Sequence, residues 1–138
     1  MDKHDIQISV ISLANPWLDF LPSAEAAAAA RDINDSINSM CGEYPGRLYA
    51  FGTLPVSAGA GACVEEVRRL KGLKWVRGVV MGTGGLGEGL DDAQMEDVWR
   101  GVEEAEMTVF LHPHYGLPKE VYGKRADEYG HVLPLALG

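Results

Sequence analysis

The sequence predicts an α/β fold in which parallel strands alternate with helices. Apolar, β-branched segments alternate with segments whose apolar residues recur at three- and four-residue steps. The four predicted strands end near residues 15, 54, 82 and 112, which is close to the ~30-residue length of one β-α-β unit. Because right-handed crossovers join parallel strands, the carboxyl ends of all four strands should lie along one edge of the sheet.

Two elements account for the first third of the chain. Residues 6–14 form a nearly continuous apolar run with several β-branched residues, typical of a strand buried on both faces. Residues 23–43 predict a helix, because the alanine run at 26–30 has high helix propensity and apolar residues follow at helical steps. The side chains expected on its inward face are those of Ala30, Ile33, Ile37, Met40 and Tyr44.

The same alternation continues to residue 112. Residues 48–54, 75–81 and 107–111 predict three further strands, each bounded by proline, glycine or charged residues. Two helices are expected between these three strands, and Asp91 and Asp92 can cap the second helix. The side chains expected to face the sheet are Cys63, Val67, Leu70 and Leu73 in the first of these helices and Met95, Val98, Val102 and Ala105 in the second.

Composition limits what this chain binds and where it works. It has 138 residues, 46% of them hydrophobic, and a formal net charge of −8, which suits one packed domain. The acidic balance argues against nucleic acid and anionic membrane as partners, because both require clustered Lys and Arg. No apolar run approaches the ~20 residues of a membrane span. The two cysteines, Cys41 and Cys63, form no C-x-x-C pair, so the sequence predicts no disulfide framework and a cytoplasmic location.

The acidic side chains of the helices are expected to be solvated. They fall in pairs at Glu65-Glu66, Glu96-Asp97 and Glu103-Glu104. The sequence contains no G-x-S-x-G motif and no P-loop, and neither cysteine has a convincing histidine or acidic partner. The chain therefore offers no nucleophile of these known types.

His112 carries the strongest chemical signal in the sequence. It ends a buried strand at the edge where functional groups should gather, and neutral imidazole is the commonest metal ligand. Two interpretations stay open, a metal ligand or a hydrogen-bonded structural histidine, because a metal site needs at least three protein ligands. His114 lies on the other side by strand alternation and is expected in a loop. His131 is either a hydrogen-bonding loop residue or an interface residue.

Asn15 and Trp17 lie at the same predicted edge. Asn15 precedes Pro16, where asparagine is commonly a turn residue, but its place after a strand equally suits a hydrogen bond to a substrate carbonyl or carboxylate. Trp17 either forms the wall of a pocket there or simply packs. We therefore treat Asn15 and Trp17 as candidate substrate-binding residues. Thr53 and the loop of residues 82–89 share this edge.

The loop after the third predicted strand contains a glycine motif. Residues 82–87 match the G-x-G-x-x-G pattern of dinucleotide-binding proteins. In those proteins the helix begins within the motif, whereas here residues 88–90 intervene before Asp91. The next strand also ends in His112, where an acidic ribose-binding residue is expected. This context favours a mobile loop that covers a substrate over a nucleotide-binding module.

Four segments of the chain resemble a known family. Residues 8–17 (ISVISLANPW), 82–92 (GTGGLGEGLDD), 110–118 (FLHPHYGLP) and 128–138 (EYGHVLPLALG) are similar, in this order, to segments of the metal-dependent decarboxylases of the amidohydrolase superfamily. The resemblance implies a (β/α)8 TIM barrel of the metal-dependent hydrolase type, of which this chain covers about strands 2 to 5. Residues 1–138 would then be the central part of one barrel domain, with its N- and C-terminal parts missing.

The resemblance also implies roles for individual residues. His112 would ligate a divalent metal, usually zinc, and Asn15, with Trp17 beside it, would contact the substrate. No catalytic residue is assigned, because the family's first-strand H-x-H or E-x-H motif, its later catalytic histidine and its final metal-binding aspartate match no position here. Gly84 stands where a serine is common in the family, which would alter the stiffness of the loop.

The function implied by the resemblance is non-oxidative decarboxylation. Zn2+ or another divalent metal would hold a small aromatic or heteroaromatic carboxylic acid together with Asn15, and its charge would stabilise the transition state. The complete enzyme is expected to be a homo-oligomer, a dimer or a tetramer. This chain alone is expected to be inactive, because it keeps one of about four metal ligands. The alternatives are a metal-dependent hydrolase of the amidohydrolase type and a non-catalytic remnant.

Overall fold

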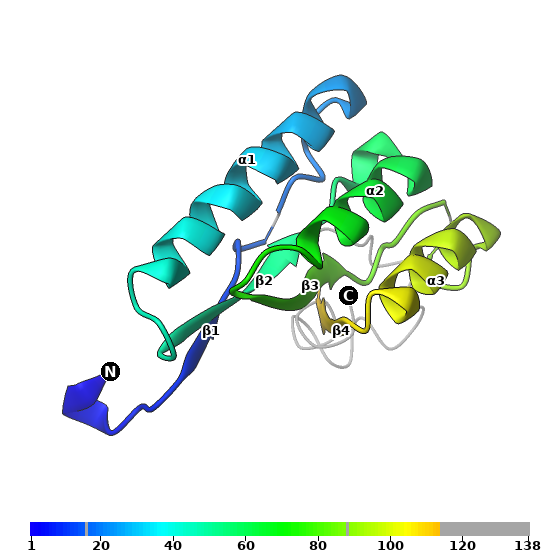
Figure 1. The fold of residues 1–138 in the computed structure, drawn as a ribbon. Helices are drawn as coiled ribbons and strands as arrows, with labels where there is room; N and C mark the ends of the chain where they lie inside the picture. Colours follow the sequence, from blue (N-terminus) through cyan, green and yellow to red (C-terminus); the bar gives the residue numbers. More distant parts are fainter. Residues whose placement is uncertain (16, 88, 114–138) are drawn as a thin grey trace, which may run out of the picture.

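The computed structural model describes residues 1–15, 17–87 and 89–113. The expectations for His114, His131 and the segment that follows His112 and Pro113 lie outside the described residues. Four parallel strands form one sheet in the order β1-β2-β3-β4 (Figure 1), which confirms the predicted parallel α/β arrangement. The strands are β1 (Ser9–Ile11), β2 (Leu48–Thr53), β3 (Val76–Gly82) and β4 (Thr108–His112).

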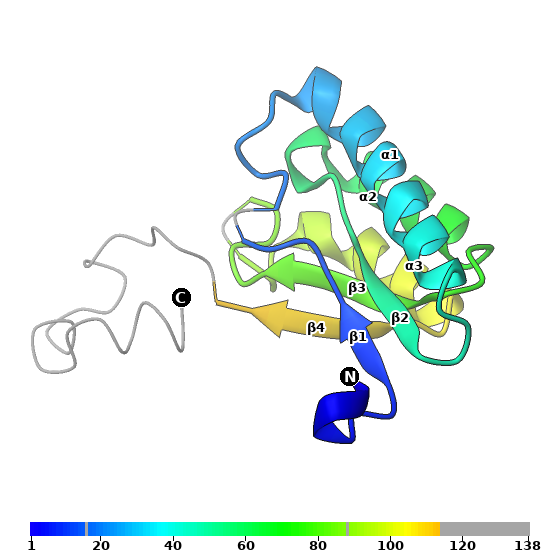
Figure 2. The same ribbon diagram turned by 90° about the vertical axis from the view of Figure 1, so that its left-hand side faces the viewer.

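Three helices cover one side of this sheet (Figures 1 and 2), and each of them connects two consecutive strands. They are α1 (Ser23–Gly42), α2 (Ala60–Leu70) and α3 (Glu96–Glu104). Short 3-10 helices precede β1, α2 and α3, namely η1 (Asp2–His4), η2 (Val56–Ala58) and η3 (Ala93–Met95). Within the described ranges, no helix has both the length and the apolar character needed to cross a membrane.

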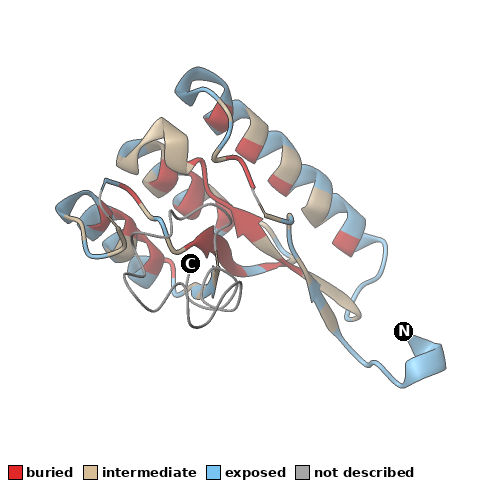
Figure 3. Cartoon of the chain, turned by 180° about the vertical axis from the view of Figure 1, so that it is seen from behind, coloured by how far each residue is buried: buried red, intermediate tan, exposed pale blue. Residues whose placement is uncertain are grey.

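The core lies between the sheet and the helices. Buried residues fall on the strands and on the helix sides that face them, as the red segments of Figure 3 show. The inward positions predicted for α2 and α3 are buried, except that Leu73, just after α2, is half-buried. The largest fully buried apolar side chains are those of Leu54, Leu70, Met95, Val67, Val79, Val80 and Val98.

The buried side of α1 agrees with the predicted one only in part, since Ala30 is buried and Ile37 packs against the core as expected. Ala30, Asn34 and Cys41 are buried, whereas Met40 and Tyr44 are 49% and 54% exposed. Small side chains let the helix approach the sheet closely, and a polar Asn34 is tolerated there because its amide finds hydrogen-bond partners. The apolar spacing therefore predicts the helix and part of its inward face, but it misses the buried Asn34 because that residue is polar.

The sheet has a second face, which points away from the helices. A Cβ atom at Gly52 would meet Leu70 of α2, so position 52 of β2 faces the helices. Side chains alternate along a strand, so the neighbouring Phe51 and Thr53 point to the opposite face. The Phe51 ring stacks on that of Phe110 with centroids 5.8 Å apart, which places Phe110 on the same face. We call this the open face. Its residues include Val10, Tyr49, Phe51, Thr53, Val80, Phe110 and His112.

The glycine loop after β3 folds against the start of α3. Leu86 is buried in the core and forms an antiparallel bridge with Gly89. Of the two predicted caps, Asp92 is the one that accepts a hydrogen bond from the backbone N–H of Gln94, at 2.8 Å. Helical structure starts only at residue 93, so the motif lacks the helix N-terminus that a dinucleotide site requires. The mobility of the loop stays a prediction.

Candidate functional site

The structure brings the three predicted site residues together at the carboxyl edge of the sheet. Asn15 follows β1, and its side-chain nitrogen donates a hydrogen bond to the carbonyl oxygen of Pro113, directly after β4, at 3.2 Å. The ring of Trp17 lies edge-on to the ring of His112, with centroids 5.6 Å and planes 80° apart. Residues that follow the two outer strands therefore contact each other across this edge, although they are 98 positions apart in the sequence.

The His112 ring is half-buried and has neighbours on three sides. Its Nδ1 atom lies 2.9 Å from the carbonyl oxygen of Pro113, and the rings of Trp17 and Phe110 both approach it edge-on. A carbonyl oxygen only accepts hydrogen bonds, so in the neutral ring Nδ1 carries the proton and Nε2 keeps a lone pair. This arrangement suits metal ligation through Nε2, because metal-bound histidines commonly donate their other N–H to a carbonyl.

Trp17 is held in a tight turn and is only 5% exposed. Its backbone φ is 51°, a left-handed conformation that is uncommon for a residue other than glycine. The backbone N–H of Trp17 donates to the carbonyl oxygen of Ala14 at 3.0 Å, which closes the turn that also carries Asn15. Trp17 thus packs against His112 in this structure. A contact between Trp17 and a substrate stays a prediction.

Among the described residues, the buried oxygen atoms without a hydrogen-bond partner include two in candidate-site positions at this edge. They are Oδ1 of Asn15 and Oγ1 of Thr53. Unpaired buried polar atoms are rare and costly, and where they occur they commonly mark a functional position or a site for a bound water or ion. The sequence places Thr53 at this edge without a role, and its unpaired hydroxyl now adds it to the candidate site.

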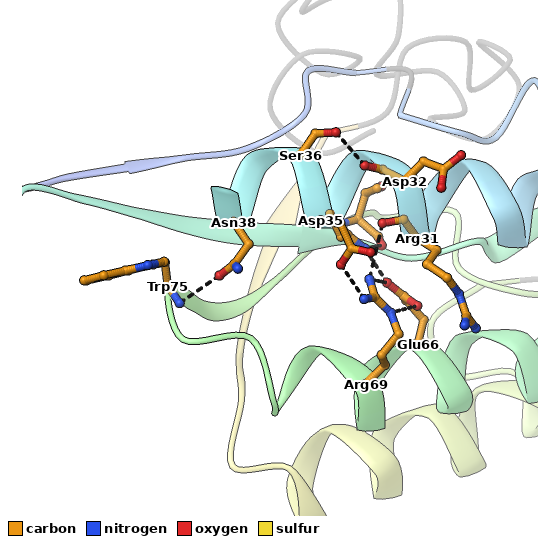
Figure 4. Close-up of polar contacts among 10 residues, drawn as sticks. Arg31, Asp32, Asp35, Ser36, Asn38, Glu66, Arg69 and Trp75 are labelled. Atoms are coloured by element: carbon orange, nitrogen blue, oxygen red, sulfur yellow. Dashed lines mark hydrogen bonds and ion pairs between the residues drawn. The ribbon is translucent and has the colours of Figure 1, made fainter. Parts of the chain in front are cut away.

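A buried polar network supports Thr53 from the helix side. Asn34 of α1 donates from Nδ2 to the Thr53 carbonyl at 2.9 Å and accepts from the Thr53 N–H on Oδ1, also at 2.9 Å. Its Nδ2 also donates to Oε1 of Glu66 in α2, at 2.7 Å. Arg69 binds both carboxylate oxygens of Glu66 and also pairs with Asp35 (Figure 4). One chain of polar contacts therefore joins two helices to the carboxyl end of β2.

The prediction that Glu66 is solvated is wrong. Its side chain is 3% exposed, because it follows Cys63 and precedes Leu70 at helical spacing and so shares their inward face. A buried carboxylate needs a partner, and Arg69, three residues further along the same helix, supplies it. The spacing of Glu66 from Cys63 was the signal in the sequence that could have revealed this network.

The pKa shifts in this region follow from the same burial and pairing. Hydrogen bonds to Glu66, followed by those to Asp35, raise the pKa of Arg69, so its guanidinium stays charged. Burial raises the pKa of the Cys63 thiol to about 12, and the negative charge of Asp19 adds to this shift. Burial also raises the pKa of Cys41. Both cysteines are free and protonated at neutral pH, which agrees with the expected lack of thiol chemistry.

The described residues supply one donor suited to a metal, not a complete site. Among them, no group of three or more histidine, cysteine, aspartate or glutamate side chains lies close enough to hold an ion. His112 fits the role of one ligand, because its Nε2 lone pair is not used by the contact with Pro113. A metal at this edge would need further ligands from other parts of the protein.

Comparison with known proteins shows what the chain is similar to. No family model matches the sequence. The chain is 31% identical over 126 residues to the gamma-resorcylate decarboxylase of Rhizobium sp. (strain MTP-10005), a match that covers 87% of this chain and 38% of that relative. It is 25% identical over 114 residues to the 2-amino-3-carboxymuconate-6-semialdehyde decarboxylase of Dictyostelium discoideum, of which it covers 32%. The chain therefore spans well under half the length of the curated relatives it matches.

Solved structures give a match over the whole chain. The IDCase of Metarhizium anisopliae in its apo form superposes with a TM-score of 0.84 and 54% sequence identity, covering 100% of this chain and 36% of that one. The homologues of the present chain are decarboxylases of the amidohydrolase superfamily. A 2,6-dihydroxybenzoate decarboxylase solved with 2,6-dihydroxybenzoate matches 96% of the chain with a TM-score of 0.78 and 28% identity.

The amidohydrolase-superfamily structures also explain the open face of the sheet. They are TIM-barrel enzymes of which this chain covers about 36–44%, and its four parallel strands form part of such a barrel. A 5-carboxyvanillate decarboxylase from Novosphingobium aromaticivorans, solved with bound manganese, shares the fold at a TM-score of 0.79 and 21% identity. In a TIM barrel the helices lie outside and the other sheet face lines the interior, so the open face belongs to the barrel interior.

Proposed function

We propose that the complete protein is a metal-dependent, non-oxidative decarboxylase of a small aromatic or heteroaromatic carboxylic acid. The observation that carries the proposal is the meeting of Asn15, Trp17 and His112 at the carboxyl edge of the sheet. In TIM barrels this is the edge on which active sites are built. The similarity to the IDCase of Metarhizium anisopliae and to gamma-resorcylate decarboxylase supports the same reaction class.

We further propose that His112 holds a divalent metal through Nε2. Support comes from its Nδ1 contact with Pro113 and from the manganese bound in the 5-carboxyvanillate decarboxylase that shares this fold. Zinc is the metal we expect, and the remaining ligands would come from other parts of the complete protein. When bound, such an ion supplies positive charge that stabilises negative charge on the substrate oxygens in the transition state.

Asn15 would bind the substrate through the groups of its amide that Pro113 does not use. One N–H of its Nδ2 donates to Pro113, so the groups left for a ligand are the other N–H of Nδ2 and the buried, unpaired acceptor Oδ1. An acceptor pairs with a hydroxyl or ring N–H and not with an ionised carboxylate. We therefore expect Oδ1 of Asn15 to accept from a donor on the ring next to the carboxylate, while the second N–H of Nδ2 makes the expected contact with a carboxylate oxygen. Trp17 would close the pocket beside it.

Assembly and location complete the proposal. We expect the complete protein to be a homo-oligomer, a dimer or a tetramer, which light scattering of the purified protein would test. We also expect it in the cytoplasm, because Cys41 and Cys63 are free and not joined in a disulfide.

The test is release of carbon dioxide by the complete protein. We would incubate it with hydroxybenzoic and pyrimidine carboxylic acids after chelation and after addition of Zn2+ or Mn2+. We expect metal-dependent release that is lost in His112→Gln and kept in His4→Gln, a matched change at an exposed residue of η1. Hydrolysis of amides or lactones without any decarboxylation would instead identify a hydrolase of the same fold.

A further inference from the structure

The carbonyl oxygen of Pro113 is shared by two side chains of the candidate site. Nδ1 of His112 lies 2.9 Å from it, and Nδ2 of Asn15 lies 3.2 Å from it. Because a carbonyl oxygen only accepts hydrogen bonds, both nitrogen atoms must donate. The shared carbonyl therefore determines which way the Asn15 amide points and which ring nitrogen of His112 carries the proton.

We propose that Asn15 is a positioning residue that selects the Nδ1-protonated tautomer of His112 through the carbonyl of Pro113. The tautomer of a histidine is set by the hydrogen bond that one of its ring nitrogens makes. Here that hydrogen bond goes to a carbonyl in the segment that leaves β4. Asn15 comes from the other outer strand of the sheet, and its hydrogen bond fixes this carbonyl from across the edge.

The surroundings of His112 restrict its ring in a way that fits this role. The rings of Trp17 and Phe110 stand nearly perpendicular to it, at 80° and 83°, with centroids 5.6 and 5.9 Å away. Trp17 belongs to the same turn as Asn15, because its N–H donates to Ala14. One turn after β1 therefore supplies both the aromatic contact and the hydrogen bond that acts on the carbonyl partner of His112.

The chemistry of Asn15 makes the role specific to its amide. Only Nδ2 can donate to Pro113, while Oδ1 is buried and has no partner among the described residues. Replacement by aspartate keeps the size of the side chain but puts an oxygen against the carbonyl oxygen, which removes the hydrogen bond and adds repulsion. The value of the Nδ1-protonated tautomer as a metal ligand rests on the proposed function, but the tautomer itself does not.

The experiment measures the tautomer of His112 directly. The chain is labelled with 15N-histidine, and long-range 1H–15N correlation spectra are recorded at pH 8 without metal. His112 is assigned by the loss of its signals in His112→Gln. The variants are Asn15→Asp and Asn15→Ala. The control is Asn38→Asp, because Asn38 uses its Oδ1 to accept from the Trp75 N–H, at 3.0 Å, and aspartate keeps that acceptor (Figure 4).

We expect His112 to be mainly Nδ1-protonated in the unchanged chain. The ratio of Nδ1–H to Nε2–H should fall about fivefold in both Asn15 variants, as the loss of one hydrogen bond predicts, and should not move in Asn38→Asp. A mainly Nε2-protonated ring, or an unchanged ratio in the Asn15 variants, overturns the proposal. If amide spectra show that one Asn15 variant does not fold, the other variant decides, and an Nε2-protonated ring in the unchanged chain overturns the proposal in either case.

The outcome is separable from that of the proposed function. A complete protein that releases no carbon dioxide, but whose His112 is Nδ1-protonated and responds to Asn15, would refute the decarboxylase and leave the positioning role standing. Decarboxylation with an Nε2-protonated His112 would support the decarboxylase and refute the positioning role of Asn15.

Discussion

Asn34 forms hydrogen bonds with both the backbone N–H and the backbone carbonyl of Thr53, so a side chain of α1 takes the place of a neighbouring strand at the end of β2. The pairing of β1 with β2 ends at Ile11 and Ala50, three residues before Thr53. The backbone of Thr53 would otherwise be buried with unpaired polar groups. Asn34 therefore holds the last residue of β2 at the edge that carries the candidate site.

Replacing Asn34 should destabilise the chain strongly. Asn34→Leu fills the space but leaves the Thr53 N–H, its carbonyl and Glu66 without this partner, and we expect the free energy of unfolding to fall by about 3 kcal/mol. Asn38→Ala is the control on the same helix. It loses one hydrogen bond to the Trp75 N–H and should cost about 1 kcal/mol. Urea unfolding followed by tryptophan fluorescence measures both, and equal losses would contradict the role given to Asn34.

The charge on Glu66 should matter, whereas that on its neighbour Glu65 should not. Glu66→Gln keeps the shape but removes the negative charge that pairs with Arg69, and we expect a loss of about 2 kcal/mol at pH 7. Glu65 is exposed on the same helix, so Glu65→Gln should change stability by less than about 0.5 kcal/mol. A small effect of both changes, measured by urea unfolding, would show that the charge of the buried carboxylate contributes little to the free energy of unfolding.

Most of the fold could be predicted from the sequence because its signals are local. The four strands and three helices appear where apolar runs and helical spacing indicate, although the first strand shrinks from residues 6–14 to Ser9–Ile11. Burial on α1 could not be predicted from apolar spacing, because Asn34 is buried while Met40 is exposed. A buried polar side chain depends on partners in other elements, and the spacing of residues within one helix does not reveal them.

The candidate site could be predicted in position but not in its contacts. Parallel strands bring Asn15, Thr53 and His112 to one edge, which follows from the order of elements. The hydrogen bond from Asn15 to Pro113 and the edge-on contact of Trp17 with His112 depend on how far the sheet curves, because they join segments that follow opposite edge strands. Curvature arises from the packing of the whole sheet, so no short sequence motif encodes it.

The raised pKa of Cys63 should make stability fall at alkaline pH. Its pKa is about 12 in the folded chain, against a usual value of 9.0. The folded state therefore binds the proton more tightly, and this contribution is complete below pH 9 and is lost as the pH rises towards 12. We expect the free energy of unfolding to decline less steeply between pH 9 and 11 in Cys63→Ala than in the unchanged chain. Parallel declines in urea unfolding series would show that the thiol makes no such contribution.

Gly78 should not tolerate even a methyl group. A Cβ at this position of β3 would overlap the carbonyl oxygen of Thr108 and lie 3.0 Å from the ring of Phe51, so Gly78→Ala must push β4 or the stacked Phe51 and Phe110 rings aside. We expect a loss of about 2 kcal/mol in the free energy of unfolding. Gly61→Ala is the matched control, since nothing lies near its Cβ position, and it should raise stability by about 0.5 kcal/mol. Opposite signs for the two changes in urea unfolding would support the close approach of β3 and β4 beneath the aromatic rings. A neutral Gly78→Ala would mean that the strands shift apart at little cost and that the rings beside His112 are not held in place by this contact.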